Sequence, residues 1–272
     1  MQKSAVGSIE VTALIDLVQS YPATTVYPEL KDTARFAAYL DPDGAVALTF
    51  ASFLLRDAET LLLVDTGWGP EHDGTLLMEL AEAGVKPQQV THVLFTHLHG
   101  DHTGWNIDRR SGHPMFPNAR HLVPQADWEH YGKEAARDRA SANRPWLSSF
   151  ERDVQPLQAR GLMDLVSGDH IISSGLTAVP TPGHTPGHMS VAITSNGEHG
   201  FILGDVVLTP IDAEEPGLES TFDWDKPLAV RTRTATIERL IADRALVGAS
   251  HLPPQGLGSF VRAATGQRWQ PL

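Results

Sequence analysis

Four metal-binding side chains fall within six consecutive residues of this chain. The segment is Thr96-His-Leu-His-Gly-Asp-His102, and its candidate ligands are His97, His99, Asp101 and His102. Imidazole nitrogen and carboxylate oxygen are the atoms that Zn²⁺ and similar divalent ions take as ligands. In an extended segment, positions 97, 99 and 101 would project to one side and position 102 to the other. Because the four side chains diverge, we expect two neighbouring ions that share this segment.

The motif follows a run that is typical of a buried strand. The run from Val90 to Phe95 is mainly apolar and β-branched, and Gly100 eases the turn after it. Functional side chains are often carried by loops at such strand ends. The alternative is a histidine-rich surface loop without chemistry. The alternation of ligands at a strand end favours the metal site.

Composition narrows the class of protein. The chain has 272 residues, of which 41% are hydrophobic and 20% charged, and this composition is typical of a soluble globular enzyme. We expect one domain over residues 1–272. The longest apolar runs have the length of strands, so no membrane span is expected. The beginning of the chain lacks the apolar stretch of a signal peptide, which predicts a cytoplasmic protein.

Charge and cysteine content limit the ligands and partners. The chain contains no cysteine, so any metal must be held by nitrogen and oxygen atoms. The formal net charge is −12, with 21 Lys and Arg residues, which argues against a nucleic-acid substrate. We expect a small-molecule substrate, no nucleic-acid or membrane partner, and a surface compatible with a homodimer.

Apolar patterns predict two groups of strands with helices beside them. A helix is expected near residues 73–84, with a buried face of Leu76, Leu77, Leu80 and Ala83, and a second near residues 227–243. Between the strand groups, a helical insert is expected at about residues 125–161. Strand-like runs are expected at residues 45–55, 60–65, 90–96, 120–123, 175–180, 189–194 and 200–204. The pattern predicts two packed sheets with helices outside them.

Further candidate ligands stand after later strand-like runs. His184 lies in a loop that prolines and glycines make rigid, and we take it as a ligand. His188, in the same loop, is either a hydrogen-bonding support of the site or a residue satisfied by backbone, and direct ligation is the least favoured alternative. Asp205 and His251 each follow a short apolar run. Asp205 could bridge two cations, although taken alone it would be read as a turn aspartate.

Taken in order, these motifs resemble the metallo-β-lactamase superfamily. The segment Leu63-Val-Asp65-Thr-Gly67 also matches its early strand and turn, so that the resemblance covers nearly the whole chain. It implies a four-layer αββα sandwich and two ions. The implied ligands are His97, His99 and His184 for one ion and Asp101, His102 and His251 for the other, with Asp205 bridging them. Asp65 would support the site from behind the ligands.

Later segments resemble one branch of that superfamily, which contains methyl parathion hydrolase, quorum-quenching lactonases and arylesterases. The likeness is carried by residues 222–225, 229–233, 251–258 and 268–271. Antibiotic-hydrolysing members place Cys or Ser near Asp205, and the flavin-linked branch has Glu where this chain has His99. The acidic charge disfavours the RNA-processing nucleases, and the basic C-terminal region of glyoxalase II is not apparent. The lactonases carry a tyrosine at the position of Leu208, and this departure leaves the substrate open.

The implied chemistry is hydrolysis by a hydroxide held between two metal ions. Zinc is the expected metal, with manganese, iron and cobalt as alternatives. The hydroxide would attack a small neutral ester or lactone, and Asp101 or Asp205 would pass a proton to the leaving alkoxide. The alternatives are a phosphotriester hydrolase and a glyoxalase-II-like thioesterase. A non-enzymatic metal-binding protein is least favoured, because such a protein need not keep all seven ligands.

Aromatic residues near the motifs are the candidates for the substrate pocket. Trp68 and Trp105 follow metal-site loops and could either hold an apolar group or belong to the core. Leu208 is a third candidate. Trp146 and Phe150 of the helical insert could cap the cleft, but packing on a helix face is favoured for both.

Overall fold

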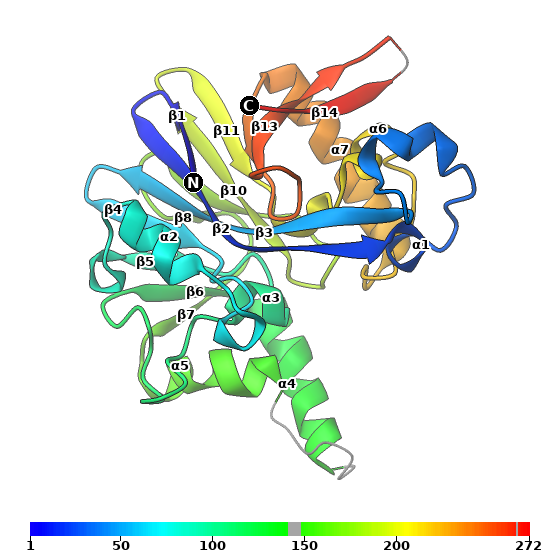
Figure 1. Cartoon of the computed structure of the whole chain (residues 1–272). Coiled ribbons are helices and arrows are strands. Elements are labelled where there is room, and N and C mark those ends of the chain that lie inside the picture. Colours follow the sequence, from blue (N-terminus) through cyan, green and yellow to red (C-terminus); the bar gives the residue numbers. More distant parts are fainter. Residues whose placement is uncertain (141–147, 265) are drawn as a thin grey trace.

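The structure, a computed structural model, describes residues 1–140, 148–264 and 266–272 and is built on two seven-stranded sheets (Figure 1). The first sheet follows the chain order: β1 (Gln2–Val6), β2 (Ile9–Pro22), β3 (Ala45–Asp57), β4 (Thr60–Val64), β5 (His92–Leu94), β6 (Arg120–Pro124) and β7 (Met163–Val166). The second has the order β14-β13-β12-β11-β10-β9-β8: β8 (His170–Ile171), β9 (Leu176–Pro180), β10 (Met189–Ser195), β11 (Glu198–Ile202), β12 (Leu246–Gly248), β13 (Leu257–Arg262) and β14 (Gln267–Pro271).

Helices cover the outer faces of both sheets. The α-helices are α1 (Ala23–Val26), α2 (Leu76–Glu82), α3 (Gly100–Thr103), α4 (Gln125–Ala140), α5 (Gln155–Ala159), α6 (Pro210–Glu214) and α7 (Lys226–Asp243). Short helical turns are η1 (Ala34–Tyr39), η2 (Pro70–His72), η3 (Pro87–Gln89), η4 (Phe150–Val154) and η5 (Gly204–Val206). Helices α2, α4 and α5 share one apolar cluster with the first sheet, whereas α7 shares another with the second. The predicted αββα sandwich is confirmed.

The two faces of β4 explain why the sheets lie inside the molecule. Leu62 and Val64 pack in the cluster between the sheets, while Leu61 and Leu63 pack toward the outer helices. Successive strand residues point to opposite faces, so a continuous apolar strand is buried on both sides. The central cluster takes side chains from both sheets, among them Phe53 and Val191. Hydrophobic burial between and outside the sheets therefore fixes the four layers.

Strands and helices differ from the sequence prediction mainly at their ends. The helix expected near residues 73–84 is the shorter α2, because Asp73 adopts a left-handed φ of 57° after η2. Strand β5 spans three residues of the longer run that was expected. Strand β12 is the short apolar run that was expected before His251, whereas strands β1, β2, β7, β8, β13 and β14 were not among the predicted runs. Each of these lies at or near a sheet end, where only tertiary pairing distinguishes a strand from a loop.

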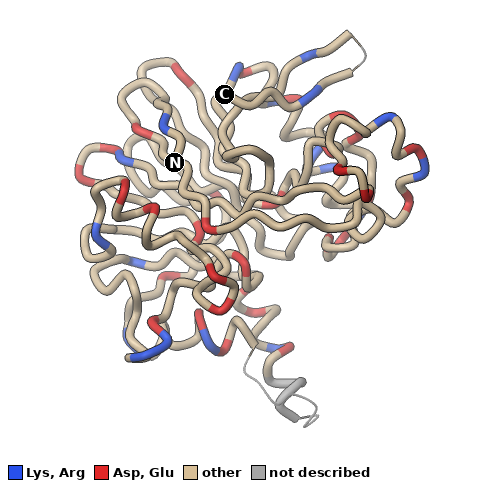
Figure 2. The backbone as a smooth tube through the Cα atoms, in the orientation of Figure 1, with Lys and Arg blue, Asp and Glu red and all other residues tan. Residues whose placement is uncertain are grey.

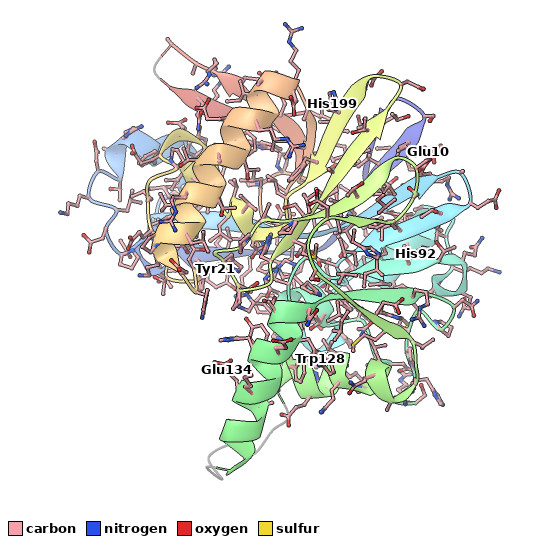
Figure 3. The ribbon with its side chains drawn as sticks, turned by 180° about the vertical axis from the view of Figure 1, so that it is seen from behind. Glu10, Tyr21, His92, Trp128, Glu134 and His199 are labelled. Carbon is pink, nitrogen blue, oxygen red and sulfur yellow. The ribbon has the colours of Figure 1, made fainter. Side chains whose placement is uncertain are left out.

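The helical insert corresponds to α4, η4 and α5. Figure 3 labels Trp128 and Glu134 on α4, which extends away from the sheets. Phe150 is buried and contacts the ring of Trp128, as packing on a helix face requires. Trp146 lies outside the described residues. The organisation as one domain over residues 1–272 stays a prediction.

Strand β2 carries an irregularity that matters for the site. Its pairing with β3 shifts between Ile15 and Leu17, so Asp16 is the extra residue of a bulge. A bulge redirects the side chain it carries. Asp16 is 1% exposed and accepts hydrogen bonds from the backbone N–H groups of Trp68 (2.7 Å) and Leu76 (2.9 Å). The bulge therefore anchors the loop after β4.

Within the described ranges, no helix is long and apolar enough to cross a bilayer. The cytoplasmic location and the homodimer stay predictions.

Candidate metal centre

The candidate ligands lie at the ends of strands that face one another across the sandwich. His97 and His99 follow β5, and His184 lies in the loop between β9 and β10. Asp205 lies in η5 directly after β11, and His251 follows β12. Strands β11 and β12 are parallel neighbours, so the residues after them emerge at one edge of the second sheet.

The central motif is not extended throughout, contrary to the sequence prediction. The backbone at His99 is extended, but Gly100–Thr103 forms the helical turn α3. Asp101 therefore does not project with His97 and His99. It joins His102, and both lie in a second cluster. The prediction that residues 97, 99 and 101 project to one side was wrong, because a helical turn that begins at Gly100 replaces the expected extended segment.

Three imidazoles form the first cluster, which consists of His97, His99 and His184. Nε2 of His97 lies 3.0 Å from Nδ1 of His99, and Nε2 of His184 lies 3.1 Å from the same atom. Ligands about 2.1 Å from a tetrahedral zinc ion are separated by about 3.4 Å. The three nitrogens thus have nearly the spacing that one such ion requires.

The second cluster contains two carboxylates and two imidazoles: Asp101, His102, Asp205 and His251. Nε2 of His102 lies 3.3 Å from an oxygen of Asp101 and 3.3 Å from Oδ1 of Asp205. Nε2 of His251 lies 3.1 Å from Oδ2 of Asp205. Within each cluster all candidate donor atoms lie within 4.8 Å of one another.

Asp205 also reaches the first cluster. Its Oδ2 lies 3.3 Å from Nε2 of His184 and 3.8 Å from Nε2 of His97. Nε2 of His102 and Oδ1 of Asp205 are buried and have no hydrogen-bond partner in the described part of the chain. Buried polar atoms without partners are costly unless a ligand satisfies them. The residues present therefore fit two divalent cations that share Asp205.

The outward-facing nitrogen of each of three histidines is held by an oxygen. Nδ1 of His102 donates to Asp65 (2.8 Å), Nδ1 of His184 to Asp223 (3.1 Å), and Nδ1 of His251 to the carbonyl of Thr49 (2.9 Å). A proton on Nδ1 leaves the lone pair of Nε2 directed into the cluster. These oxygens therefore select the tautomer that can bind a metal.

Asp65 accepts hydrogen bonds from three groups of the central motif. Its carboxylate accepts from the backbone N–H of Thr96 (2.7 Å), from the hydroxyl of Thr96 (2.8 Å) and from His102. Asp65 has a left-handed φ of 62°, which aspartate tolerates better than most residues. Three donors on one buried carboxylate fix the strand end that carries the ligands.

His188 contacts the backbone of Asp205 and is not a member of either cluster. Its Nε2 accepts from the N–H of Asp205 (3.0 Å), and its Nδ1 lies 2.8 Å from the hydroxyl of Thr181. Gly204 permits this contact, because its φ is 59° and a Cβ there would lie 2.7 Å from Nε2 of His188. Among the interpretations left open by the sequence, these hydrogen bonds favour a supporting role for His188.

Sequence reasoning missed the buried network behind His184. Asp223 accepts from His184 and also from Nη2 of Arg233 (3.1 Å), whose side chain is fully buried. Arg233 also donates through Nε to the carbonyl of Val206, next to Asp205. Both residues fall in segments that carried the branch resemblance. Their role was not visible there, because nothing local shows that helix α7 packs behind the site.

A second residue that was missed joins the two ligand loops. Asp127 on α4 is fully buried and accepts from the N–H of Leu98 (3.2 Å), the N–H of Gly187 (2.6 Å) and the hydroxyl of Thr185 (2.8 Å). Leu98 stands between His97 and His99, while Thr185 and Gly187 follow His184. One carboxylate thus holds the two loops of the first cluster together.

Burial and charge set the protonation of the site. Burial lowers the pKa of His99 to about 4, and the neighbouring His184 adds to this effect, so the ring is neutral near pH 7. Burial opposes ionisation of Asp205, yet His251 and His102 hold the pKa of its carboxyl well below its usual range. Burial disfavours the charged forms of His102 and His251, but Asp205 and Asp101 outweigh it and raise the pKa values of both rings, so a divalent cation would displace protons from them on binding.

A cavity of about 280 Å³ lies over both clusters. Its floor contains His99, Asp101, His184, Asp205 and His251, and its other described walls are Tyr21, Leu48, Phe50, Trp68, Leu208 and Phe222. Trp68 packs on the ring of Phe50, with 4.7 Å between centroids. Trp68 and Leu208 thus lie where the sequence expected pocket residues, and their contact with substrate stays a prediction.

Trp105 lies elsewhere. It packs against the outer cluster of the first sheet, and its indole donates to Asp16 (2.8 Å). It is not among the described residues that line the cavity. The bulge in β2 explains this position, because it directs the Asp16 carboxylate toward the indole.

Comparisons with known proteins agree with the fold and the site. Residues 51–245 match the family model described as the metallo-beta-lactamase superfamily. An uncharacterized protein of Bacillus subtilis, YobT, is 30% identical over 153 residues, which are 56% of this chain and 60% of that protein. An N-acyl homoserine lactonase of Bacillus cereus is 24% identical over 222 residues, which are 73% of this chain and 76% of the lactonase.

Two solved structures share the whole architecture. The hydrolase AbOPH superposes with a TM-score of 0.85 at 26% identity, covering 99% of this chain and 96% of its own. AidC, described as a dizinc quorum-quenching lactonase, superposes with a TM-score of 0.84 at 24% identity, covering 100% and 97%. Fold and site together define a class of metal-dependent hydrolases. Within that class, the chain belongs to the metallo-beta-lactamase superfamily.

Proposed function

We propose that this chain is a binuclear-metal hydrolase of small neutral esters or lactones. The proposal rests above all on the position of Asp205, which lies within 3.3 Å of a nitrogen from each cluster at the floor of an otherwise apolar cavity. The similarity to N-acyl homoserine lactonases supports a lactone among the candidate substrates.

The ligand assignment follows the two clusters. His97, His99 and His184 would hold one ion, Asp101, His102 and His251 the other, and Asp205 would contact both. Divalent cations in such a site lower the pKa of water and stabilise negative charge on a carbonyl oxygen, and zinc suits these nitrogen and oxygen ligands. Asp101 lines the cavity with a side chain that is 22% exposed. Asp101 or Asp205 would carry a proton to the leaving alkoxide.

The cavity walls favour a neutral substrate. No lysine or arginine occurs among the described residues that line it. Figure 2 shows the basic residues at separate places around the molecule, and the net charge is −12. An anionic substrate would meet little compensating charge outside the metal clusters. This disfavours thioesters of strongly acidic carriers and supports an apolar acyl or aryl group.

Metal analysis tests the binuclear assignment. We expect two divalent ions per chain in fully loaded protein, with zinc supporting activity. Full activity with one tightly bound ion per chain would contradict the assignment.

Side-by-side kinetics test the substrate class. With metal content fixed, we expect kcat/KM for a γ-lactone and an aryl ester to exceed that for a phosphotriester and a thioester. Metal-activated water attacks planar carbonyls readily, and a lactone keeps its leaving alkoxide tethered beside the cations. A clear preference for the phosphotriester would replace this function with the first alternative.

A further inference from the structure

The cavity over the metal clusters contains a single hydroxyl group among its described walls. Leu48, Phe50, Leu208 and Phe222 are hydrocarbon, and Trp68 is fixed between the rings of Phe50 and His72. The remaining wall residue is Tyr21. A polar atom of the substrate that does not face the clusters would therefore meet an apolar surface, apart from this phenol and the indole N–H of Trp68.

The Tyr21 hydroxyl differs from those of two nearby tyrosines. The hydroxyl of Tyr27 is 2.9 Å from that of Thr209, and the hydroxyl of Tyr39 donates to Glu214. The hydroxyl of Tyr21 has no hydrogen-bond partner in the described part of the chain. The hydroxyl of a buried tyrosine usually has a hydrogen-bond partner. Tyr21 is partly buried, so its hydroxyl is available to a ligand.

The backbone fixes where Tyr21 stands. Tyr21 is near the end of the long strand β2 and pairs with Val46 of β3, and Pro22 follows it. Burial, and then the negative charge of Asp101, raise the pKa of the Tyr21 phenol. The phenol therefore stays protonated near neutral pH and can donate a hydrogen bond to a ligand in the cavity that it lines.

We infer that the phenol of Tyr21 donates a hydrogen bond to the carbonyl oxygen of the ester or lactone under attack. The inference rests on the proposed function. Negative charge grows on that oxygen as the carbonyl becomes tetrahedral, so a donor placed beside it stabilises the transition state more than the bound substrate. Leu208, on another wall of the same cavity, has no group that could do this.

The variant Tyr21→Phe removes one oxygen atom and no described hydrogen bond, so it should fold and bind metal as the wild type does. For the best ester or lactone substrate, we expect kcat to fall about tenfold to a hundredfold, while KM changes less than about threefold. The matched control is Tyr39→Phe, whose phenol does not line the cavity and whose kcat should be unchanged. Metal content and melting temperature are measured for all three proteins.

A pair of esters separates the carbonyl oxygen from the leaving oxygen. The loss in Tyr21→Phe should be equal for a 4-nitrophenyl ester and an alkyl ester of the same acid, because both share the carbonyl. Unchanged kcat in a folded, metal-loaded Tyr21→Phe would overturn the inference and leave the proposed function intact. A loss confined to the alkyl ester would overturn it in favour of a leaving-group contact. A wild-type protein without activity on any ester or lactone would overturn the proposed function and this inference together.

Discussion

Asp205 is the residue on which both ligand clusters depend. Its two oxygens lie 3.1 Å from His251 and 3.3 Å from His184 and His102. His188 touches the same residue only through the backbone N–H. The side chain and the backbone of Asp205 thus have different partners. Substitutions at Asp205 and at His188 therefore test the two kinds of contact separately.

We expect Asp205→Ala to lose more activity than His188→Ala. Removal of the shared carboxylate should abolish binding of at least one ion and reduce kcat/KM by about a thousandfold or more. Loss of a supporting hydrogen bond typically costs 10- to 100-fold. Metal content and kinetics of both folded variants check this, and equal losses would contradict the assigned positions.

The segment before α7 carries two aspartates with different partners. Asp223 accepts from His184 and Arg233, whereas Asp225 caps the helix by accepting from the N–H of Leu228 (3.0 Å). The two residues are close in sequence, but only Asp223 contacts a candidate ligand. They therefore form a matched pair for testing support of the metal site.

Asp223→Ala should weaken metal binding by about 10- to 100-fold, because His184 loses the acceptor that orients its ring. Asp225→Ala should lower the free energy of unfolding by about 1 kcal/mol through loss of the helix cap, with metal affinity unchanged. Competition with a chromogenic chelator measures affinity, and urea unfolding measures stability. If both variants bind metal as the wild type does, Asp223 has no supporting role.

The bulge of β2 connects this strand to Trp68 in the wall of the cavity. Asp16 holds the backbone of Trp68 and Leu76 and the indole of Trp105. Because all three donors would lose a buried acceptor, Asp16→Ala should lower the free energy of unfolding by about 2 to 4 kcal/mol. The exposed Asp43→Ala is the control and should change it by less than about 0.5 kcal/mol. Urea unfolding of metal-loaded protein checks the difference, and similar values for both variants would exclude the anchoring role.

The metal centre joins the two halves of the molecule. His97, His99, Asp101 and His102 belong to the part of the chain that forms the first sheet, whereas His184, Asp205 and His251 belong to the second. Each cluster takes members from both halves. Ions bound there would stabilise the packing of one sheet on the other, since a ligand that binds only the folded state adds to its stability.

Removal of metal should therefore lower the melting temperature of the whole chain. Free metal at 100 times its dissociation constant contributes about 2.7 kcal/mol per site, and we expect a decrease of about 5 °C or more after chelation. Return of zinc should restore it. Asp205→Ala should respond less, and a wild-type protein that melts identically with and without chelator would contradict a structural contribution of the ions.

The sequence by itself determined the ligand types and the layered fold. His97, His99, Asp101 and His102 are close along the chain, so their proximity did not depend on the tertiary structure. Alternation and length of apolar runs indicated the strands, because a buried face requires them. The resemblance carried by the ordered motifs added the remaining candidate ligands and the family, and the comparisons confirm the family.

Only the tertiary structure decided the local backbone geometry of these ligands and which residues hold them. Gly100–Thr103 forms a helical turn where an extended segment was expected, and packing of α4 and α7 brought Asp127, Asp223 and Arg233 behind the site. Such contacts join residues far apart in sequence, so no local pattern encodes them. For the same reason Trp105 lies against the core while Tyr21, from the second strand, lines the cavity. Local periodicity specifies elements, but the packing of side chains from distant elements specifies a site.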